Sequence, residues 1–343
     1  MEQTAPMLAK AVAVVPEPDS VEGGLLYEPK WDGFRAILYW DGDALEIGSR
    51  GSKPLTRYFP EIAEAVARQL AVPCVLDGEI VVRSGQTGAE RLDWEALSAR
   101  IHPAESRIRR LAAETPASFV AFDLLEFDGR SLLNEPFSVR RAALEDIPLA
   151  APLHLSQITR DVELARRWLV DFEGAGLDGV VAKPLAASYA PGKRVMLKTK
   201  HRRTADVVVL GYRVHKSGTG VGSLLLGLYG EDGELHGVGG ASAFTDARRR
   251  ELIDELEPLI QRDEAGEAVR GEGERNRFSS SKDTGFVALR PERVVEVRYD
   301  QMEGARFRHT VQVERWRDDR EARSCTFDQL EVPTAHDLDE VLR

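Results

Sequence analysis

Apolar residues recur along the first two hundred positions at two spacings, and each spacing predicts a different kind of element. Helical spacing at 59–70 and at 162–172 predicts two helices, the second capped at its start by Asp161. A third helix is expected over 90–101. Buried strands are predicted by continuous or alternating apolar runs at 25–27, 36–40, 75–82, 119–127 and 179–182. This part of the chain therefore mixes strands with helices.

The pattern changes after Arg203. One helix is expected near 252–260, among strands at 206–214, 223–229, 294–299 and 310–313. Strands wrapped around a single helix within about 130 residues are typical of a small Greek-key barrel of the OB type. We therefore expect an α+β protein with two domains. Residues 1–203 would form antiparallel sheets with flanking helices, and residues 204–343 an OB-fold β-barrel.

Composition narrows the class of protein. The chain has 343 residues and a net charge of −11, from 46 basic and 57 acidic side chains. This balance argues against a general nucleic-acid coat protein, but basic residues cluster at 193–203 and 306–320. No apolar stretch approaches the roughly 20 residues needed to cross a bilayer. Two distant cysteines exclude a four-cysteine zinc site and fit a reducing cytoplasm, which is the expected location.

The most informative segment runs from Glu28 to Arg35 and centres on Lys30, between two predicted strands. A lysine in a short turn between strands is poorly placed for a solvated surface role. Acid, lysine, acid and arginine alternate there, with Gly33 where a turn residue of positive φ is expected. An amine attacks phosphorus only after it loses its proton, and neighbouring cations favour that loss. The segment therefore suits a nucleophilic lysine.

Further short motifs follow Lys30 in a fixed order. They are Ser49-Arg50-Gly51, Asp77-Gly78-Glu79, Phe122-Asp123, Asp178-Gly179-Val180-Val181-Ala182-Lys183, Lys198-Thr199-Lys200 and Arg317-Asp318-Asp319-Arg320. With the Lys30 segment, this ordered set resembles the nucleotidyl-lysine motifs of ATP-dependent DNA ligases and of their capping-enzyme and RNA-ligase relatives. Two positions depart from the family pattern. Asp178 stands where glutamate is usual, and Arg320 stands where lysine is usual.

The resemblance implies an adenylation domain followed by the OB domain, and it implies a role for each motif. Lys30 would be the catalytic nucleophile, with Asp178 and Glu79 as metal ligands. Mg²⁺ on these carboxylates, with Mn²⁺ as an alternative, would neutralise charge at the α-phosphate. The nucleotide-binding residues would be Glu28, Arg35, Arg50, Glu79, Phe122, Lys183, Lys198, Lys200, Arg317 and Arg320.

The function implied is nick sealing in duplex DNA by an ATP-dependent ligase, through a covalent lysine–AMP intermediate, in DNA repair. The cofactors expected are ATP and Mg²⁺, and the main partner is nicked double-stranded DNA. Recruitment by a DNA-end-binding protein of the Ku type follows by analogy only. We expect a monomer associated with the nucleoid and not with a membrane.

Several alternatives remain open on sequence alone. An RNA ligase or a capping guanylyltransferase shares the lysine chemistry, whereas NAD-dependent ligases carry a four-cysteine zinc module that two cysteines cannot build. A non-catalytic DNA-end-binding module is a further alternative. Phe122 alternates with Val120 and Leu124, so core packing competes with base stacking as its role. Arg317 and Arg320 suit contacts to DNA phosphates as well as to pyrophosphate.

Overall fold

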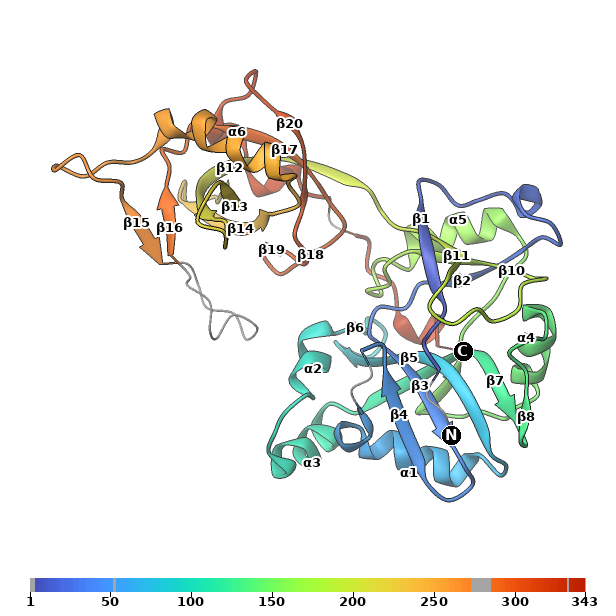
Figure 1. Ribbon diagram of the computed structural model, residues 1–343. Coiled ribbons are helices and arrows are strands. Elements are labelled where there is room, and N and C mark those ends of the chain that lie inside the picture. Colours follow the sequence, from blue (N-terminus) through green and yellow to red (C-terminus); the bar gives the residue numbers. More distant parts are fainter. Residues whose placement is uncertain (1–3, 52–53, 273–284, 332, 343) are drawn as a thin grey trace. The chain divides into compact units, whose positions relative to one another are not determined.

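The computed structural model describes residues 4–51, 54–272, 285–331 and 333–342. The chain divides into two compact units, Met1–Lys200 with Pro333–Arg343, and His201–Val332 (Figure 1). The predicted division fell three residues later and gave everything after it to the second domain. The structure returns residues 333–342 to the first unit because Leu338, Val341 and Leu342 are buried in that unit's core.

The larger sheet of the first unit carries the two long buried strands predicted from sequence. Its strand order is β4-β3-β5-β7-β8, with β6 paired to β5 and β9 paired to β7. All pairings are antiparallel except that of β9. The strands are β3 (Phe34–Trp40), β4 (Leu45–Ser49), β5 (Cys74–Ser84), β6 (Arg91–Leu92), β7 (Ala117–Phe127), β8 (Arg130–Ser131) and β9 (Leu153–Leu155).

The smaller sheet of the first unit joins segments from the two ends of the 1–200 region. The order is β1-β11-β10-β2, in which β1 runs parallel to β11. The strands are β1 (Leu8–Val12), β2 (Leu25–Pro29), β10 (Val180–Pro184) and β11 (Arg194–Thr199). The turn after β2 is therefore brought beside the segment that enters β10.

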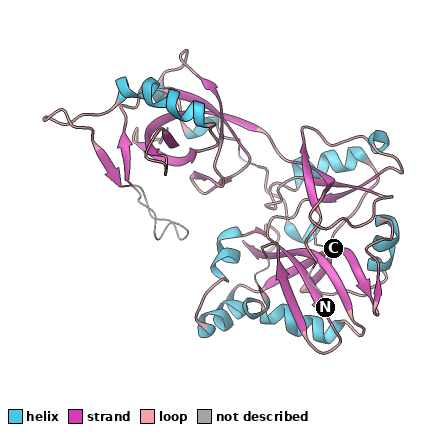
Figure 2. Cartoon of the chain, viewed as in Figure 1, coloured by secondary structure: helices cyan, strands magenta, loops and turns pink. Residues whose placement is uncertain are grey.

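Helices flank the sheets of the first unit (Figure 2). They are α1 (Pro60–Gln69), α2 (Trp94–Ala99), α3 (Glu105–Glu114), α4 (Phe137–Glu145) and α5 (Val162–Asp171). The helix predicted over 90–101 is shorter than expected. Arg91 and Leu92 pair with β5 instead, and Asp93 starts α2 by accepting a hydrogen bond from the amide of Ala96.

In its described residues, the second unit has an antiparallel sheet, a separate two-stranded sheet formed by β18 and β19, and one α-helix. Strand β12 is central and pairs with β13, β16 and β17, while β17 also pairs with β20. The elements are β12 (Arg203–Val214), β13 (Val221–Tyr229), β14 (Leu235–Ala241), α6 (Asp246–Leu256), β15 (Arg270–Glu272), β16 (Gly285–Ala288), β17 (Val294–Tyr299), β18 (Met302–Glu303), β19 (Arg306–Phe307) and β20 (Gln312–Trp316). Leu252 and Leu256 of α6 pack into the core of this unit.

In the part of the chain that the structure describes, no helix is long and apolar enough to cross a membrane.

Candidate active site

The Lys30 turn is fixed by backbone hydrogen bonds to the segment before β10. The amide of Lys30 donates to the carbonyl of Gly179 at 2.8 Å, and the carbonyl of Lys30 accepts from the amide of Asp178 at 3.0 Å. Gly179 has a φ of +139°, and a Cβ there would lie 2.0 Å from the carbonyl oxygen of Thr199. Only glycine fits this approach. The packing holds Lys30 opposite Asp178, although 148 residues separate them.

Asp178 lies between two ammonium groups. Its Oδ2 accepts from Nζ of Lys30 at 2.5 Å and pairs with Nζ of Lys200 at 2.8 Å. The Asp178 side chain is 4% exposed, whereas that of Lys30 is 20% exposed. The buried carboxylate therefore orients the amine while leaving it open to solvent. No group of three or more metal-ligating side chains occurs among the residues that the structure describes. Asp178 and Glu79 nevertheless supply the hard carboxylate oxygens that suit Mg²⁺, which takes its other ligands from phosphates and water.

Gly33, which follows Lys30 by three residues, is required for space and not for a positive φ. Its φ lies outside the left-handed region, but a Cβ would lie 2.1 Å from the carbonyl oxygen of Ile80 on β5. Its amide donates to Oε1 of Glu79 at 3.2 Å. The close approach of the turn to β5 therefore also anchors the Glu79 carboxylate.

Arg35 is held by a buried carboxylate. Its Nε and Nη2 donate to Oδ1 and Oδ2 of Asp77 at 2.6 and 2.7 Å. Tyr189 donates its hydroxyl proton to Oδ2 of the same carboxylate at 2.7 Å, and that hydroxyl accepts from the amide of Met7 at 2.9 Å. Burial, and then the Asp77 charge, raises the pKa of Tyr189, so the hydroxyl remains a donor. Asp77 lies on β5, within the strand predicted over 75–82, and its side chain is a fully buried anchor.

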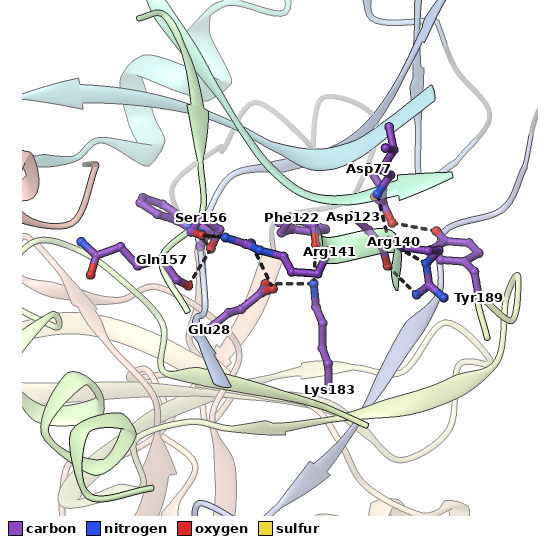
Figure 3. Close-up of polar contacts among 12 residues, drawn as sticks. Glu28, Asp77, Phe122, Asp123, Arg140, Arg141, Ser156, Gln157, Lys183 and Tyr189 are labelled. Carbon is purple, nitrogen blue, oxygen red and sulfur yellow. Dashed lines mark hydrogen bonds and ion pairs between the residues drawn. The ribbon is translucent and has the colours of Figure 1, made fainter. Parts of the chain in front are cut away.

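Glu28 and Lys183 form a buried ion pair at another part of the pocket wall (Figure 3). Nζ of Lys183 lies 2.9 Å from Oε2 of Glu28 and donates to the carbonyl of Phe122 at 2.9 Å. The same Nζ is 4.5 Å from the centroid of the Phe122 ring, and Cζ of Arg35 is 4.3 Å from it. Burial raises the pKa of Glu28 against the opposing effects of Lys183 and Arg141, and burial lowers the pKa of Lys183. The Phe122 ring therefore makes cation–π contacts with both Lys183 and Arg35.

Glu79 and Lys198 complete the charged wall. Burial raises the pKa of Glu79 to about 7, although Arg35 and Lys30 oppose this shift. Burial also lowers the pKa of Lys198, and the neighbouring charges of Lys30 and Lys200 lower it further. The ammonium groups of Lys30, Lys198 and Lys200 are therefore close enough to repel one another. Bound anionic phosphates would reduce this repulsion.

A single pocket collects most of the residues predicted from sequence. Eight of them line it: Glu28, Lys30, Arg35, Arg50, Glu79, Phe122, Lys183 and Lys198. Lys200 and Asp178 reach it through Lys30. Sequence reasoning missed the other lining residues, which are Pro6, Met7, Leu8, Ala9, Pro29, Trp31, Val181, Arg194 and Met196. Arg194 belongs to the basic cluster at 193–203, and Trp31 is next to Lys30 in sequence. Both positions could therefore have been predicted as site residues. Nothing in the sequence marked β1.

Arg317 and Arg320 belong to the second unit and share one carboxylate there. Nη1 of Arg317 lies 2.9 Å from Oδ2 of Asp206, and Nη1 of Arg320 lies 3.4 Å from the same oxygen. Nε of Arg317 also donates to Oδ1 of Asp319 at 2.8 Å. The predicted motif therefore folds as one cluster of basic side chains around Asp206.

Comparison with known proteins identifies two regions of the chain. Residues 6–200 match the ATP dependent DNA ligase domain, and residues 217–320 match the ATP dependent DNA ligase C terminal region. The chain is 52% identical over 359 aligned positions to DNA ligase C of Mycobacterium tuberculosis H37Rv, covering 100% of this chain and 98% of that protein. It is also 31% identical over 280 positions to the multifunctional non-homologous end joining DNA repair protein LigD of the same organism. That alignment covers 80% of this chain and 34% of that protein.

Among solved structures, a Lig E DNA ligase described as binding DNA with a minimal scaffold superposes with a TM-score of 0.58. The match covers 92% of this chain and 100% of that one, at 18% identity, so it concerns the fold alone. The predicted fold class, an α+β nucleotidyltransferase unit followed by an OB-fold, is confirmed.

Proposed function

Because the chain belongs to the ATP-dependent DNA ligase family, we propose a specific role for each residue around Lys30 in the reaction of that family. The chain is an ATP-dependent DNA ligase, which seals nicks in duplex DNA through a lysine–AMP intermediate. The observation that carries the assignment of roles is the position of Lys30. Its amine lies in a basic pocket, 2.5 Å from the buried Asp178 carboxylate.

In the first step, Nζ of Lys30 attacks the α-phosphorus of ATP, a P–N bond forms, and pyrophosphate leaves with the electrons of the P–O bond. Oδ2 of Asp178 is the nearest acceptor for the proton that Nζ loses. Arg50 and Lys198 line the pocket and would hold the phosphates in line for displacement. Positioning and charge stabilisation dominate the catalysis of such a transfer.

The base would bind where Glu28, Lys183 and Phe122 meet. Among the residues that the structure describes, buried Oε1 of Glu28 has no hydrogen-bond partner, whereas Oε2 pairs with Lys183. A buried acceptor without a donor is costly, so an exocyclic amine of the base is a fitting partner. Adenine carries this amine at C6, where guanine carries a carbonyl, so a carboxylate that faces C6 favours ATP over GTP. We therefore assign Lys183 and Phe122 to binding of the base, with the Phe122 ring stacked on the base.

Asp178 and Glu79 would hold Mg²⁺, with Mn²⁺ as an alternative. When bound, the ion neutralises charge that develops on the α-phosphate and the leaving pyrophosphate. Aspartate is one methylene shorter than the glutamate usual in the family, but it offers the same hard oxygen. The protein's own contribution is to hold both carboxylates before ATP arrives. The amide of Gly33 fixes Glu79, and the backbone of Lys30 fixes Asp178.

Steps two and three act on DNA. AMP passes from Lys30 to the 5′-phosphate at the nick, and the 3′-hydroxyl then attacks that phosphate and releases AMP. We assign Arg317 and Arg320 to the pyrophosphate in the first step, with DNA phosphates as the competing assignment. Their cluster can exchange a carboxylate for a phosphate because Asp319 is 66% exposed.

The repair setting also belongs to this proposal. One relative named above is an end-joining repair protein, which supports a role at broken DNA and recruitment by an end-binding protein of the Ku type. A monomeric state and a nucleoid-associated, cytoplasmic location remain predictions.

The decisive experiment incubates the protein with α-labelled ATP and Mg²⁺ and maps the acid-labile label by peptide. We expect the label on Lys30, and we expect Lys30→Ala to lose both the label and nick sealing. Labelled GTP competing equally with ATP would favour a capping enzyme, and sealing of nicked RNA in preference to nicked DNA would favour an RNA ligase. Strand joining by Lys30→Ala at the wild-type rate would refute the proposal.

A further inference from the structure

The chain segment 333–342, which we call the returning segment, packs in the core of the first unit. It lies beyond both ranges matched by the family, 6–200 and 217–320. Leu338 and Val341 are fully buried in the hydrophobic cluster that also contains Trp31 and Phe122 of the pocket wall. The amide of Leu338 donates to the carbonyl of Glu90 at 2.9 Å. Figure 1 shows this red end of the chain among the strands of the first unit.

Gln157 connects the returning segment to the residues behind the pocket. Its Nε2 donates to the carbonyls of Glu340 at 2.7 Å and Val341 at 3.0 Å. The preceding residue, Ser156, is buried, and its Oγ accepts from Nε1 of Trp31 at 2.9 Å. Trp31 lines the pocket beside Lys30. Gln157 can therefore fix the backbone on which Trp31 rests.

Ser156 also leads to the base end of the pocket. Its carbonyl accepts from Nη2 of Arg141 at 2.8 Å (Figure 3). Nε of Arg141 donates to Oε1 of Glu145 at 2.8 Å. Nη1 of Arg141 then lies 3.7 Å from Oε1 of Glu28, too far for a hydrogen bond. The guanidinium thus supports the charge of Glu28 without donating a hydrogen bond to Oε1. Within the described part of the chain, neither Nη1 of Arg141 nor Oε1 of Glu28 has a hydrogen-bond partner.

We propose that the returning segment is a positioning element for base recognition: by holding Gln157, it fixes Ser156, and through Ser156 it fixes Arg141, Glu28 and Trp31. The proposal rests on the assignment of Glu28 to the base of ATP. It assigns Gln157 and Arg141 as positioning residues, since neither lines the pocket. The segment that lies after the OB unit in sequence thereby serves the first step of the reaction.

Gly174→Ala displaces the returning segment without altering any residue of the pocket. A Cβ at Gly174 would lie 1.8 Å from the carbonyl oxygen of Thr334 and 2.7 Å from the amide nitrogen of His336. Both atoms are backbone, so the segment must shift. We expect the KM for ATP in enzyme–AMP formation to rise about three- to tenfold, the effect of one hydrogen bond, with a smaller change in kcat. Because guanine carries a carbonyl at C6, where adenine carries the amine assigned to Glu28, the KM for GTP should change less, and the preference for ATP should narrow.

Gln157→Glu makes the same test without a steric change. Glutamate is isosteric but cannot donate to the two carbonyls, so we expect the same rise in KM for ATP. Gln157→His, which can restore a donor at this position, should recover part of the affinity. A purely structural role would lower the unfolding temperature and leave the ratio of ATP to GTP efficiency unchanged.

Two matched controls separate attachment of the segment from alignment of the pocket. Arg83→Ala removes the exposed contact between Nη1 of Arg83 and Asp339 but leaves Gln157 in place. Gly237→Ala is a glycine substitution in the second unit, where the nearest atom to a new Cβ is 4.0 Å away. We expect wild-type KM for ATP in both.

Hydrogen exchange at the amide of Leu338 reports whether the segment is displaced. The proposal would be overturned if the segment is displaced in Gly174→Ala while the KM for ATP and the ratio of ATP to GTP efficiency stay unchanged. The same unchanged values in Gln157→Glu would also overturn it. If Gly174→Ala fails to fold, Gln157→Glu decides alone. Failure of the proposed function is a distinct outcome, because the wild-type protein would then form no adduct on Lys30. Failure of the returning segment's role leaves that adduct intact.

Discussion

Two arginine–carboxylate clusters, one in each unit, differ in how firmly the guanidinium is held. Arg35 in the first unit donates from Nε and Nη2 to Asp77, which is fully buried and also accepts from Tyr189. Arg317 in the second unit divides its donors between Asp206, 9% exposed, and Asp319, 66% exposed. The chemistry of the contacts is the same, but the access of water is not.

This difference separates a fixed pocket residue from one that can exchange partners. Arg35 cannot leave Asp77 without stranding a buried charge, so it stays in place and shapes the wall beside Phe122. Arg317 can release Asp319 to water at small cost and take a phosphate instead.

The largest effect is expected for Asp77→Asn. An amide keeps the shape but removes the charge opposite Arg35, and in either orientation its NH2 group faces a nitrogen of Arg35. We expect the free energy of unfolding to fall by about 3–5 kcal/mol, as for other broken buried pairs. Urea unfolding measures this change, and labelled ATP measures the accompanying loss of enzyme–AMP formation. A loss below about 1 kcal/mol would mean that Arg35 is not locked.

Tyr189→Phe should have the next largest effect. The substitution removes the donor to Asp77 and the acceptor for the amide of Met7, both of which lie in buried surroundings. The expected loss is about 1–3 kcal/mol of unfolding free energy. Both bonds from Arg35 to Asp77 remain, so enzyme–AMP formation should fall less than in Asp77→Asn. Tyr39→Phe is the matched control, because that hydroxyl accepts from the amide of Thr4 at 2.7 Å and donates to its carbonyl at 3.3 Å, away from Asp77.

Asp206→Asn is the counterpart of Asp77→Asn in the second unit. Asparagine retains one acceptor oxygen for Arg317 and Arg320, and water reaches both guanidinium groups, which are 18% and 34% exposed. We expect a loss of only about 0.5–1.5 kcal/mol in urea unfolding. A loss as large as that of Asp77→Asn would remove the distinction between the two clusters.

The sequence identified residues that line one pocket, but not the contacts that support them, and the chemical roles of these residues stay predictions. Lys30, Glu79 and Lys198 were identified because polar residues at fixed order in turns and on strands form a local signal. Asp77 lay within the predicted strand over 75–82, but nothing in the sequence marked it as the buried partner of Arg35. In the structure, Gly78 is a mid-strand glycine, and a Cβ there would lie 2.3 Å from the Phe119 ring. Local patterns do not reveal such contacts between strands.

The returning segment was assigned to the wrong unit for a similar reason. Leu338, Val341 and Leu342 follow an exposed stretch after the last predicted strand, and nothing in their spacing names a partner. Their burial depends on α5 and its following turn, where Gly174 admits Thr334. Arg141 was equally invisible, because a basic residue on a helix is usually solvated. Long-range packing decided both cases.

The smallest effect is expected for Asp319→Asn, and it tests the exchangeable arginine most directly. The Arg317 hydrogen bond lowers the pKa of Asp319 to about 2, so the contact persists at neutral pH and is lost only as pH falls from about 3.8 through that value. Because Asp319 is exposed, the substitution should leave the unfolding midpoint at pH 7 unchanged. It frees Nε and Nη2 of Arg317, so enzyme–AMP formation should rise by about twofold or less at low salt. Screening should abolish the gain near 1 M salt, where the Debye length is about 3 Å. A clear fall in the rate at every salt concentration would show that Asp319 holds Arg317 in its working position, and that the second cluster is as fixed as the first.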